Sequence, residues 1–217
     1  KYAKHFSGAD ISTRENAFLP TSVVNQSKYR QHLPLVLGGF EKTKYNIGHA
    51  TASSITQKIY ASVNEQGDLS DSAVRKISIV EGDVNAEGVS NIHFLPLGFE
   101  GYNLMHPAIH PNGEFMVFSS DAPGGKGGYD LYSTKKSADG KWSSPLAIQH
   151  LNTKGNEVFA TFDASGKDLY FSSDGMPGLG GLDIYKVGFA NGSVVGNPSH
   201  LSYPLNTQYD EFGFTSV

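Results

Sequence analysis

A 20-residue stretch of the chain occurs twice, 53 positions apart, and this repeat limits the possible folds more than any other feature. The stretch from Gly113 to Tyr132, GEFMVFSSDAPGGKGGYDLY, aligns without a gap on the stretch from Gly166 to Tyr185, GKDLYFSSDGMPGLGGLDIY. Ten of the 20 positions are identical, far more than unrelated segments share. A chain with such a period builds its fold from successive copies of one supersecondary unit.

Weaker copies extend the repeat towards both ends. The segment LNTKGNEVFATF, from Leu151, matches LNTQYDEFGFTS, from Leu205, at a shift of 54. Upstream, the 18 residues that begin at Tyr45 align weakly with the 18 residues that begin at Tyr102, at a shift of 57 positions. In this alignment His49 matches His106. The chain therefore divides into units near 45–101, 102–154 and 155–207, with the start of another at 208–217.

Residues 1–44 contain no convincing copy of the unit. We interpret them as an edge blade, a linker to another domain or a partner-docking arm. The segment that begins at Leu33, LPLVLGGF, is the most strand-like part of this region.

Within the clearest unit, short extended segments alternate with turns. FMVFS is apolar on both faces, as expected of a strand in a sheet that lies between two others. No segment of the repeated half shows the 3.6-residue period of an amphipathic helix. Strands are expected at Ala108–Ile109, at Phe115–Ser119, at Tyr129–Thr134 and from Lys141 onward. Four short strands per unit predict an all-β fold, a β-propeller of about four blade units or a part of a larger one.

Composition excludes several classes of protein. The 217 residues carry 17 basic and 21 acidic side chains, a net charge of −4, which argues against nucleic acid or an anionic membrane as the main partner. There is no cysteine, hence no disulfide and no thiolate metal site. No apolar run reaches the length of a transmembrane helix. The chain begins at Lys1 without a signal-peptide pattern, so we expect a processed or excised piece whose flanking domains are missing.

The glycine-rich loops, GGKGG and PGLGG, could be mistaken for phosphate-binding loops. Such a loop requires a helix after the glycines, whereas a strand is expected here. We interpret both loops as turns in which glycine permits positive φ and close backbone approach between blades. The aspartates beside them could bind calcium, but each loop supplies only two carboxylates, so acceptance of backbone N–H bonds is the favoured interpretation.

Two histidines, His106 and His110, have a spacing that would place them on one face of a strand, as two legs of a metal site. No third ligand is visible, and Phe159 and Asp163 stand at the repeated positions. We therefore expect a structural hydrogen bond at His106, while the role of His110 stays open. Ser137–Trp142 resembles a sialidase aspartate box, but its spacing is too short, and we expect a turn followed by Trp142 packed between blades.

No serine, histidine or carboxylate is singled out as catalytic, and no cofactor or metal site is predicted. The repeated Ser-Ser ends a strand in both units, which indicates a structural role because one catalytic serine would not occur twice. The residues that we assign to the structural repeat motif are His106, Gly113, Ser119, Asp121, Gly125, Gly127, Gly128, Asp130, Tyr132, Gly166, Ser172, Asp174, Gly178, Gly180, Gly181, Asp183 and Tyr185.

The sequence motif of the repeated unit resembles that of TolB-type, WD-repeat-like propeller blades. The motif consists of His-Pro, Asn-Gly, Phe-Ser-Ser-Asp and a glycine loop that ends in Asp-x-Tyr. More narrowly, it is similar to blades of OmpA-family envelope proteins of Bacteroidetes, such as the PorE-like lipoproteins of the type IX secretion system. The similarity is strong over residues 102–217, weak over 45–101 and absent before. The second copy has Phe159-Ala160 in place of His106-Pro107, and the upstream copy lacks the glycine loop. The peptidoglycan-binding domain and the lipidated cysteine of those proteins are not found in this sequence, so their functions do not transfer.

The resemblance implies a non-enzymatic interaction or scaffold module that binds protein partners of the envelope. It implies a place on the periplasmic side of the outer membrane, or on the cell surface, of a Gram-negative bacterium. The main alternative is the propeller of a glycan- or peptide-processing hydrolase, and a third possibility is a calcium-stabilised adhesin fragment. An enzyme should show convergent acidic or Ser/His groups at the central channel, whereas a binding module should show aromatic and neutral polar groups on one rim.

The C-terminal segment copies the opening of a unit, and we expect a strand there that begins a blade. Either residues 1–44 complete this blade and close a ring, or the fragment is an open arc with an exposed edge. The upstream segment lacks the glycine loop and the Asp-x-Tyr strand, so we favour the open arc.

Overall fold

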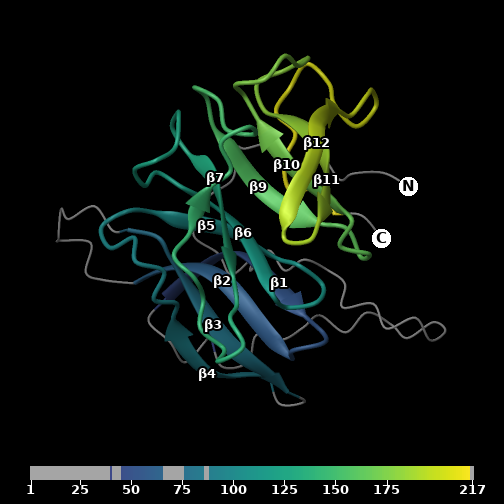
Figure 1. Ribbon diagram of the computed structural model, residues 1–217. Helices are drawn as coiled ribbons and strands as arrows, with labels where there is room; N and C mark the ends of the chain where they lie inside the picture. The colour runs from purple at the N-terminus through teal and green to yellow at the C-terminus, as the bar shows by residue number, and fades with distance from the viewer. Residues whose placement is uncertain (1–39, 41–44, 66–75, 86–87, 216–217) are drawn as a thin grey trace.

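The computed structural model describes residues 40, 45–65, 76–85 and 88–215, and the part it describes contains strands, turns and loops but no α-helix. Twelve strands form three four-stranded antiparallel sheets, each a meander in chain order (Figure 1). The first sheet contains β1 (Tyr45–Ser53), β2 (Lys58–Glu65), β3 (Ser78–Asn85) and β4 (Gly88–Phe94). The second contains β5 (Leu104–Ile109), β6 (Phe115–Ser120), β7 (Asp130–Lys135) and β8 (Leu146–Ala147). The third contains β9 (Glu157–Phe162), β10 (Asp168–Ser173), β11 (Asp183–Ala190) and β12 (Ser193–His200).

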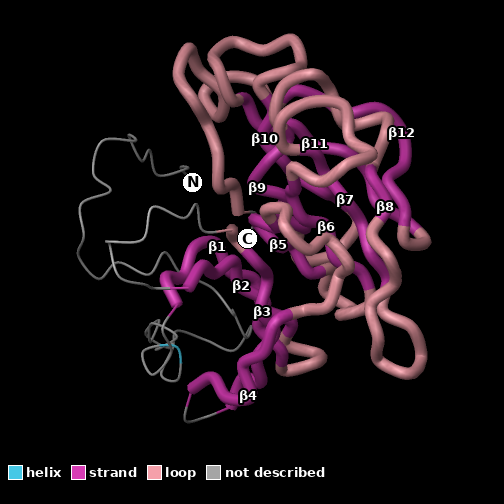
Figure 2. The backbone as a smooth tube through the Cα atoms, turned by 90° about the vertical axis from the view of Figure 1, so that its left-hand side faces the viewer, coloured by secondary structure: helices cyan, strands magenta, loops and turns pink. Residues whose placement is uncertain are grey.

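The three sheets are blades of a β-propeller. Their first strands, β1, β5 and β9, contact one another in sequence, and the later strands of each sheet lie progressively farther out (Figures 1 and 2). This is the arrangement of neighbouring propeller blades around an axis. The all-β propeller class predicted from the repeat is confirmed.

The second and third blades are copies of one another at the level of register. Ser119 of β6 pairs with Leu131 of β7, and 53 positions later Ser172 of β10 pairs with Ile184 of β11. The first strands of these two blades, β5 and β9, are the inner strands, and both have a register break at the same repeat position. The residues at these breaks, His106 and Phe159, have φ angles of 50° and 54°. Residues 103–133 and 156–186 therefore form equivalent strand–loop–strand units in neighbouring blades, as expected from the repeat.

Two expected strands differ from the structure. The fourth strand of the second blade is only Leu146–Ala147, because the residues from Lys141 to Pro145 make a single isolated bridge, between Lys136 and Trp142, in place of a strand. At the C-terminus, residues 211–215 form no strand, since no described segment pairs with them. Whether residues 1–44 complete a blade lies outside the described residues, apart from Phe40, which is buried against the first blade.

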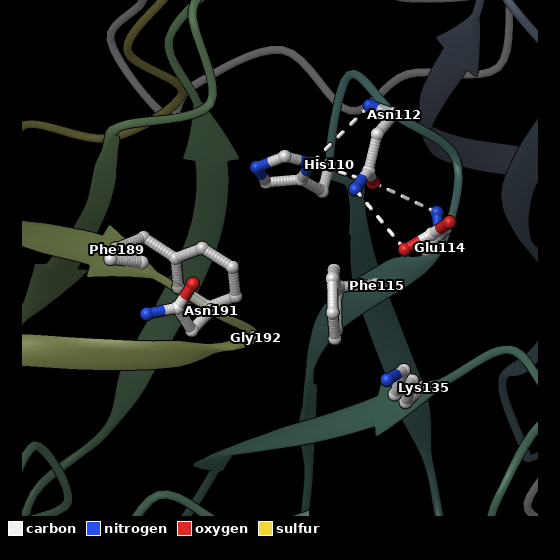
Figure 3. A pocket seen from close by; sticks show the side chains of 9 residues that line it. His110, Asn112, Glu114, Phe115, Lys135, Phe189, Asn191 and Gly192 are labelled. Atoms are coloured by element: carbon white, nitrogen blue, oxygen red, sulfur yellow. Dashed lines mark hydrogen bonds between the residues drawn. The ribbon is translucent and has the colours of Figure 1, made fainter.

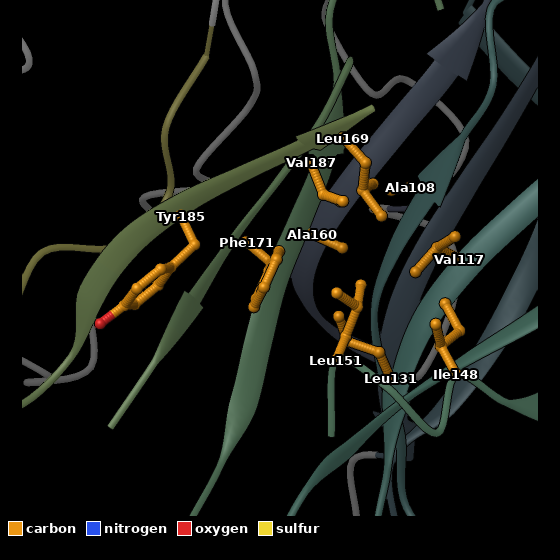
Figure 4. Packing of buried hydrophobic residues seen from close by; sticks show 10 residues of the cluster. All are labelled: Ala108, Val117, Leu131, Ile148, Leu151, Ala160, Leu169, Phe171, Tyr185 and Val187. Atoms are coloured by element: carbon orange, nitrogen blue, oxygen red, sulfur yellow. The ribbon is translucent and has the colours of Figure 1, made fainter. Parts of the chain in front are cut away.

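Apolar side chains between the sheets form the cores. β6 is buried on both faces, as its unbroken apolar sequence predicts, because it lies between the first and the third blade. One cluster joins the second blade to the third (Figure 4). Its members are Ala108, Val117, Leu131, Ile148, Leu151, Ala160, Leu169, Phe171, Tyr185 and Val187.

Candidate functional site

The aspartates that end the glycine loops are internal acceptors. The buried Asp130 carboxylate accepts the backbone N–H groups of Lys126 and Gly127 at 2.9 to 3.1 Å. In the third blade, Asp183 accepts those of Leu179 and Gly180 at 2.9 and 3.0 Å. The geometry agrees with our interpretation of the loops as hydrogen-bonded turns.

Gly125 and Gly178 permit these turns because each lies against the aspartate. A Cβ at either glycine would come within 2.0 Å of a carboxylate oxygen of Asp130 or Asp183, respectively. Glycine is therefore required at both positions by close approach.

The aspartates that follow the second strands hold the start of the first strands. Asp121 accepts the backbone N–H and the side-chain amide of Asn103 at 2.6 and 2.8 Å. Asp174 accepts the same two groups of Asn156 at the same two distances. The described residues contain no group of three or more His, Asp or Glu side chains that could hold a metal ion.

Gly128 and Gly181 are restricted by close approach between blades, which is one of the two reasons that we expected for glycine in these loops. Neither has the positive φ that is the other reason; in the first loop a positive value occurs at Gly124, with φ of 104°. A Cβ at Gly128 would come within 2.4 Å of the Asn156 amide oxygen, because the next blade's connecting segment lies against the loop. The same holds at Gly181 and, through neighbouring backbone, at Gly127 and Gly180.

The motif tyrosines are hydrogen-bonded within their own blades, and the motif serines Ser119 and Ser172 are buried. The Tyr132 hydroxyl donates to the Ala122 carbonyl at 2.6 Å, and that of Tyr185 donates to the Pro177 carbonyl at 2.7 Å. Ser119 and Ser172 are buried in the second strands, and the Ser119 hydroxyl has no hydrogen-bond partner there.

Aromatic rings from successive blades form a column where the inner strands meet. The His106 ring stacks on Phe159 at 3.9 Å between centroids, His49 packs edge-on against His106 at 5.9 Å, and Phe212 stacks on Phe159 at 4.8 Å. Burial lowers the pKa of His106 to about 3 and that of His49 to about 4. The Nδ1 atoms of both rings are buried without a hydrogen-bond partner. The column therefore consists of uncharged rings that pack against one another.

The inference that the spacing of His106 and His110 places both on one face of a regular strand is wrong. The bulge after Met105 inserts a residue into β5, so the simple alternation of faces is lost between the two histidines. The expected structural hydrogen bond at His106 is made by its backbone N–H, which donates to the Ser62 hydroxyl at 3.0 Å, and not by the ring. His110 instead donates from Nε2 to the Gly166 carbonyl at 3.0 Å.

His110 also lines a pocket of about 430 Å³ between the β5–β6 turn and the β11–β12 hairpin (Figure 3). Phe115 and Phe189 form its apolar part, with Gly192 closely packed on the Phe115 ring. Glu114 is the one carboxylate in the lining, and Lys135 the one ammonium group. The full lining is His110, Asn112, Glu114, Phe115, Lys135, Phe189, Ala190, Asn191 and Gly192.

An ionic cluster joins the first two blades, and nothing in the sequence indicated it. Glu81 lies between Lys58 at 3.1 Å and Lys136 at 3.3 Å, and Lys136 comes from the second blade. Burial opposes ionisation of Glu81, but the two ammonium groups outweigh burial and lower its pKa. Trp142 packs edge-on against Tyr60 across the same junction, as we expected of a tryptophan between blades.

Large apolar side chains are exposed at one end of the third blade. Leu179 lies in the β10–β11 loop, and Tyr203 and Tyr209 lie in the segment after β12. Their exposed fractions are 57%, 77% and 62%, respectively. We call these three residues the apolar rim.

Comparisons with known proteins give a likeness of fold only. No family model matches the chain, and no curated protein sequence matches it. The chain is similar to TolB from Acinetobacter baumannii, with 18% identity and a TM-score of 0.47 over 75% of this chain and 34% of that one. It is similar to the β-propeller domain of the Trilobed protease from Pyrococcus furiosus, with 11% identity and a TM-score of 0.46 over 75% and 45%.

A third solved structure is a puromycin-hydrolyzing peptidase from Mycobacterium tuberculosis, with 17% identity and a TM-score of 0.48 over 73% of this chain and 24% of that one. The chain thus spans less than half the length of each of these three structures. Within the described ranges, no helix is long and apolar enough to cross a membrane.

Proposed function

We propose that this chain is a non-enzymatic interaction module, in which a rigid group of propeller blades presents a protein-binding surface at one end of the third blade. The observation that carries this proposal is the apolar rim of Leu179, Tyr203 and Tyr209. Exposed apolar patches mark interaction sites, and tyrosine is among the residues that contribute most of the binding energy at protein interfaces.

The use of the repeated polar residues supports the same function. Asp121, Asp130, Asp174 and Asp183 all accept hydrogen bonds from their own loops or strand starts. Groups that are engaged in this way position backbone and are poorly placed to act as acid or base on a substrate.

The surroundings of the inner strands also favour binding over hydrolysis. The column there consists of Phe159, Phe212 and two neutral histidines, in place of convergent carboxylates. The pocket beside His110 has Glu114 as its single carboxylate, whereas most glycosidases use two. Among the described residues, no specific arrangement favours the hydrolase alternative.

The cell envelope is the proposed location. The motif similarity to OmpA-family propellers of Bacteroidetes supports a place at the outer membrane, on its periplasmic side or at the surface. An assembly of the type IX secretion system is the proposed setting, with protein partners and without a cofactor.

Site-specific photocrosslinking tests the proposal. A benzophenone amino acid at position 203 should give a discrete protein adduct in cells that express the full chain, and Leu179→Ser should reduce the yield. The matched control carries the crosslinker at exposed Ala164, in the turn between β9 and β10 of the same blade. Equal adduct patterns from both positions, or none from position 203, would show that the rim binds no protein.

A further inference from the structure

The β11–β12 hairpin ends in a two-residue turn of Asn191 and Gly192, whose φ angles are 54° and 81°. Ala190 and Ser193 pair on either side of the turn. Positive φ at both central residues is typical of the type I′ hairpin turn, for which Asn-Gly is a preferred sequence. In the same dipeptide the asparagine amide is open to attack by the backbone nitrogen that follows it, because glycine has no side chain to hinder the approach.

The sequence contains one other Asn-Gly pair, Asn112 and Gly113 in the β5–β6 turn. Asn112 and Asn191 line the same pocket between the second and third blades (Figure 3). Both asparagines are exposed. Neither the following residue nor solvent access therefore distinguishes the two sites, and any difference between them must come from their hydrogen bonds.

Hydrogen bonds hold Asn112 and Gly113 in place. The Asn112 Oδ1 atom accepts the backbone N–H of Glu114 at 2.9 Å and lies 2.7 Å from Nδ1 of His110. The Gly113 N–H, whose nitrogen would have to attack, donates to the His110 carbonyl at 2.8 Å. Because an attack would break these bonds, the folded chain protects Asn112.

No such bonds hold Asn191 and Gly192. Among the described residues, the Asn191 side chain has no hydrogen-bond partner, and the Gly192 N–H donates to no backbone carbonyl. The turn lies at the tip of a two-strand hairpin, so it can open locally while the rest of the blade stays folded. Asn191 and Gly192 therefore supply both the free amide and the free nitrogen that the reaction requires.

We propose that Asn191 is a modification site, where the folded chain converts asparagine to aspartate or isoaspartate and thereby releases the β11–β12 hairpin from the second blade. In the first step the Gly192 nitrogen bonds to Cγ of Asn191 and the Cγ–Nδ2 bond breaks. The Gly192 amide proton leaves with the NH2 group as ammonia.

Water then opens the resulting five-membered succinimide ring. Cleavage of the new bond between Cγ and the Gly192 nitrogen gives aspartate, whereas cleavage of the original peptide bond gives isoaspartate. One water molecule is consumed and one ammonia molecule is released for each asparagine, and no atom is oxidised or reduced. The reaction thus needs no reagent other than water.

Isoaspartate is the product that would release the hairpin. It adds one methylene group to the backbone of a turn of only two residues, so the register between Ala190 and Ser193 could not be kept. Gly192 lies so close to the Phe115 ring that a Cβ there would come within 2.3 Å of a ring carbon. A displaced turn would lose this contact with the second blade. Either product also adds a carboxylate to the pocket, where Lys135 is the one ammonium group.

Peptide mapping of the aged full chain tests the site. The chain is kept at neutral pH, either folded or in concentrated urea, and the products at each asparagine are quantified by tandem mass spectrometry. In the folded chain we expect Asn191 to convert at least about tenfold faster than Asn112, because Asn112 reacts only when its turn opens. In urea the two should convert at similar rates, since glycine follows both. Equal rates in the folded chain, or conversion of Asn191 only in urea, would overturn the proposal.

Asn191→Gln is the matched control for the release of the hairpin, because it keeps the amide but could react only through a larger ring. Hydrogen exchange of residues 189–195 should become faster in the aged wild-type chain and stay constant in the aged variant. Unchanged exchange in wild-type chain that contains isoaspartate would overturn the release of the hairpin. The turn lies at the opposite end of β11 from the loop of Leu179, so neither result depends on the proposed function.

Discussion

The environment of His106 is determined by the residue at the equivalent position in the next blade, Phe159. The repeat alignment places His49, His106 and Phe159 at equivalent positions, so the alignment indicates that these side chains belong together. It does not indicate that the His106 ring stacks on Phe159, because ring contact depends on the spacing of blades in space. For the same reason the hydrogen-bonded loop aspartates were predictable from sequence, while the Glu81 cluster between blades was not.

The buried histidine predicts a specific loss of stability in acid. The pKa of His106 is about 3 in the folded chain, against 6.5 as its ordinary value, so the unfolded chain binds the proton first. Its contribution is complete above pH 6.5 and declines by up to about 1.4 kcal/mol per pH unit below it. In His106→Phe, the drop in unfolding free energy between pH 7 and 4.5 should shrink by about 2 kcal/mol in urea titrations. The exposed His150→Phe variant should retain the full drop, and an identical drop in both variants would contradict the assignment.

At the scale of the element, the glycine loops are shaped by what packs on them. The repeat predicted their positions, their role as turns and the need for glycine, either for positive φ or for close approach between blades. At Gly128 and Gly181 close approach is the reason, since a Cβ at Gly128 would come within 2.4 Å of Asn156. The sequence could not specify which residue approaches, because contacts between blades are long-range.

Gly128→Ala and Gly128→Val should both destabilise the chain, since even one methyl group meets Asn156. We expect a cost of about 1–3 kcal/mol for alanine, which is the usual range for overpacking, and no smaller cost for valine. Gly48→Ala is the matched control, because the nearest atom to its Cβ is at an ordinary 3.5 Å. Thermal unfolding followed by circular dichroism measures both variants. Equal melting temperatures for Gly128→Ala and Gly48→Ala would mean that the segment around Asn156 moves aside at no cost.

At the scale of the whole molecule, the blades behave as repeated units joined by interfaces, so stability should depend on which interface is weakened. The propeller class followed from the repeat, the strand content and the absence of a helical period. The sequence did not show whether the last copy of the unit, residues 211–215, forms a paired strand. Strand pairing there depends on a neighbouring strand that no pattern within the segment specifies. Asn152 and Asn206 form the same hydrogen bonds at two interfaces, and this makes them a matched pair.

Asn152→Ala removes a buried side chain that joins the second blade to the third and leaves the N–H and C=O of Leu131 without those partners. Loss of buried hydrogen-bond partners costs about 1–3 kcal/mol for each group, so global stability should fall clearly. Asn206→Ala makes the same chemical change where only residues 205–215 follow. We expect it to leave the melting temperature nearly unchanged while hydrogen exchange and proteolysis of residues 205–215 become faster, because a terminal element can open without the rest. If Asn206→Ala lowers the melting temperature as much as Asn152→Ala, the segment of residues 205–211 unfolds cooperatively with the blades and is as much a part of their core as residues 151–157.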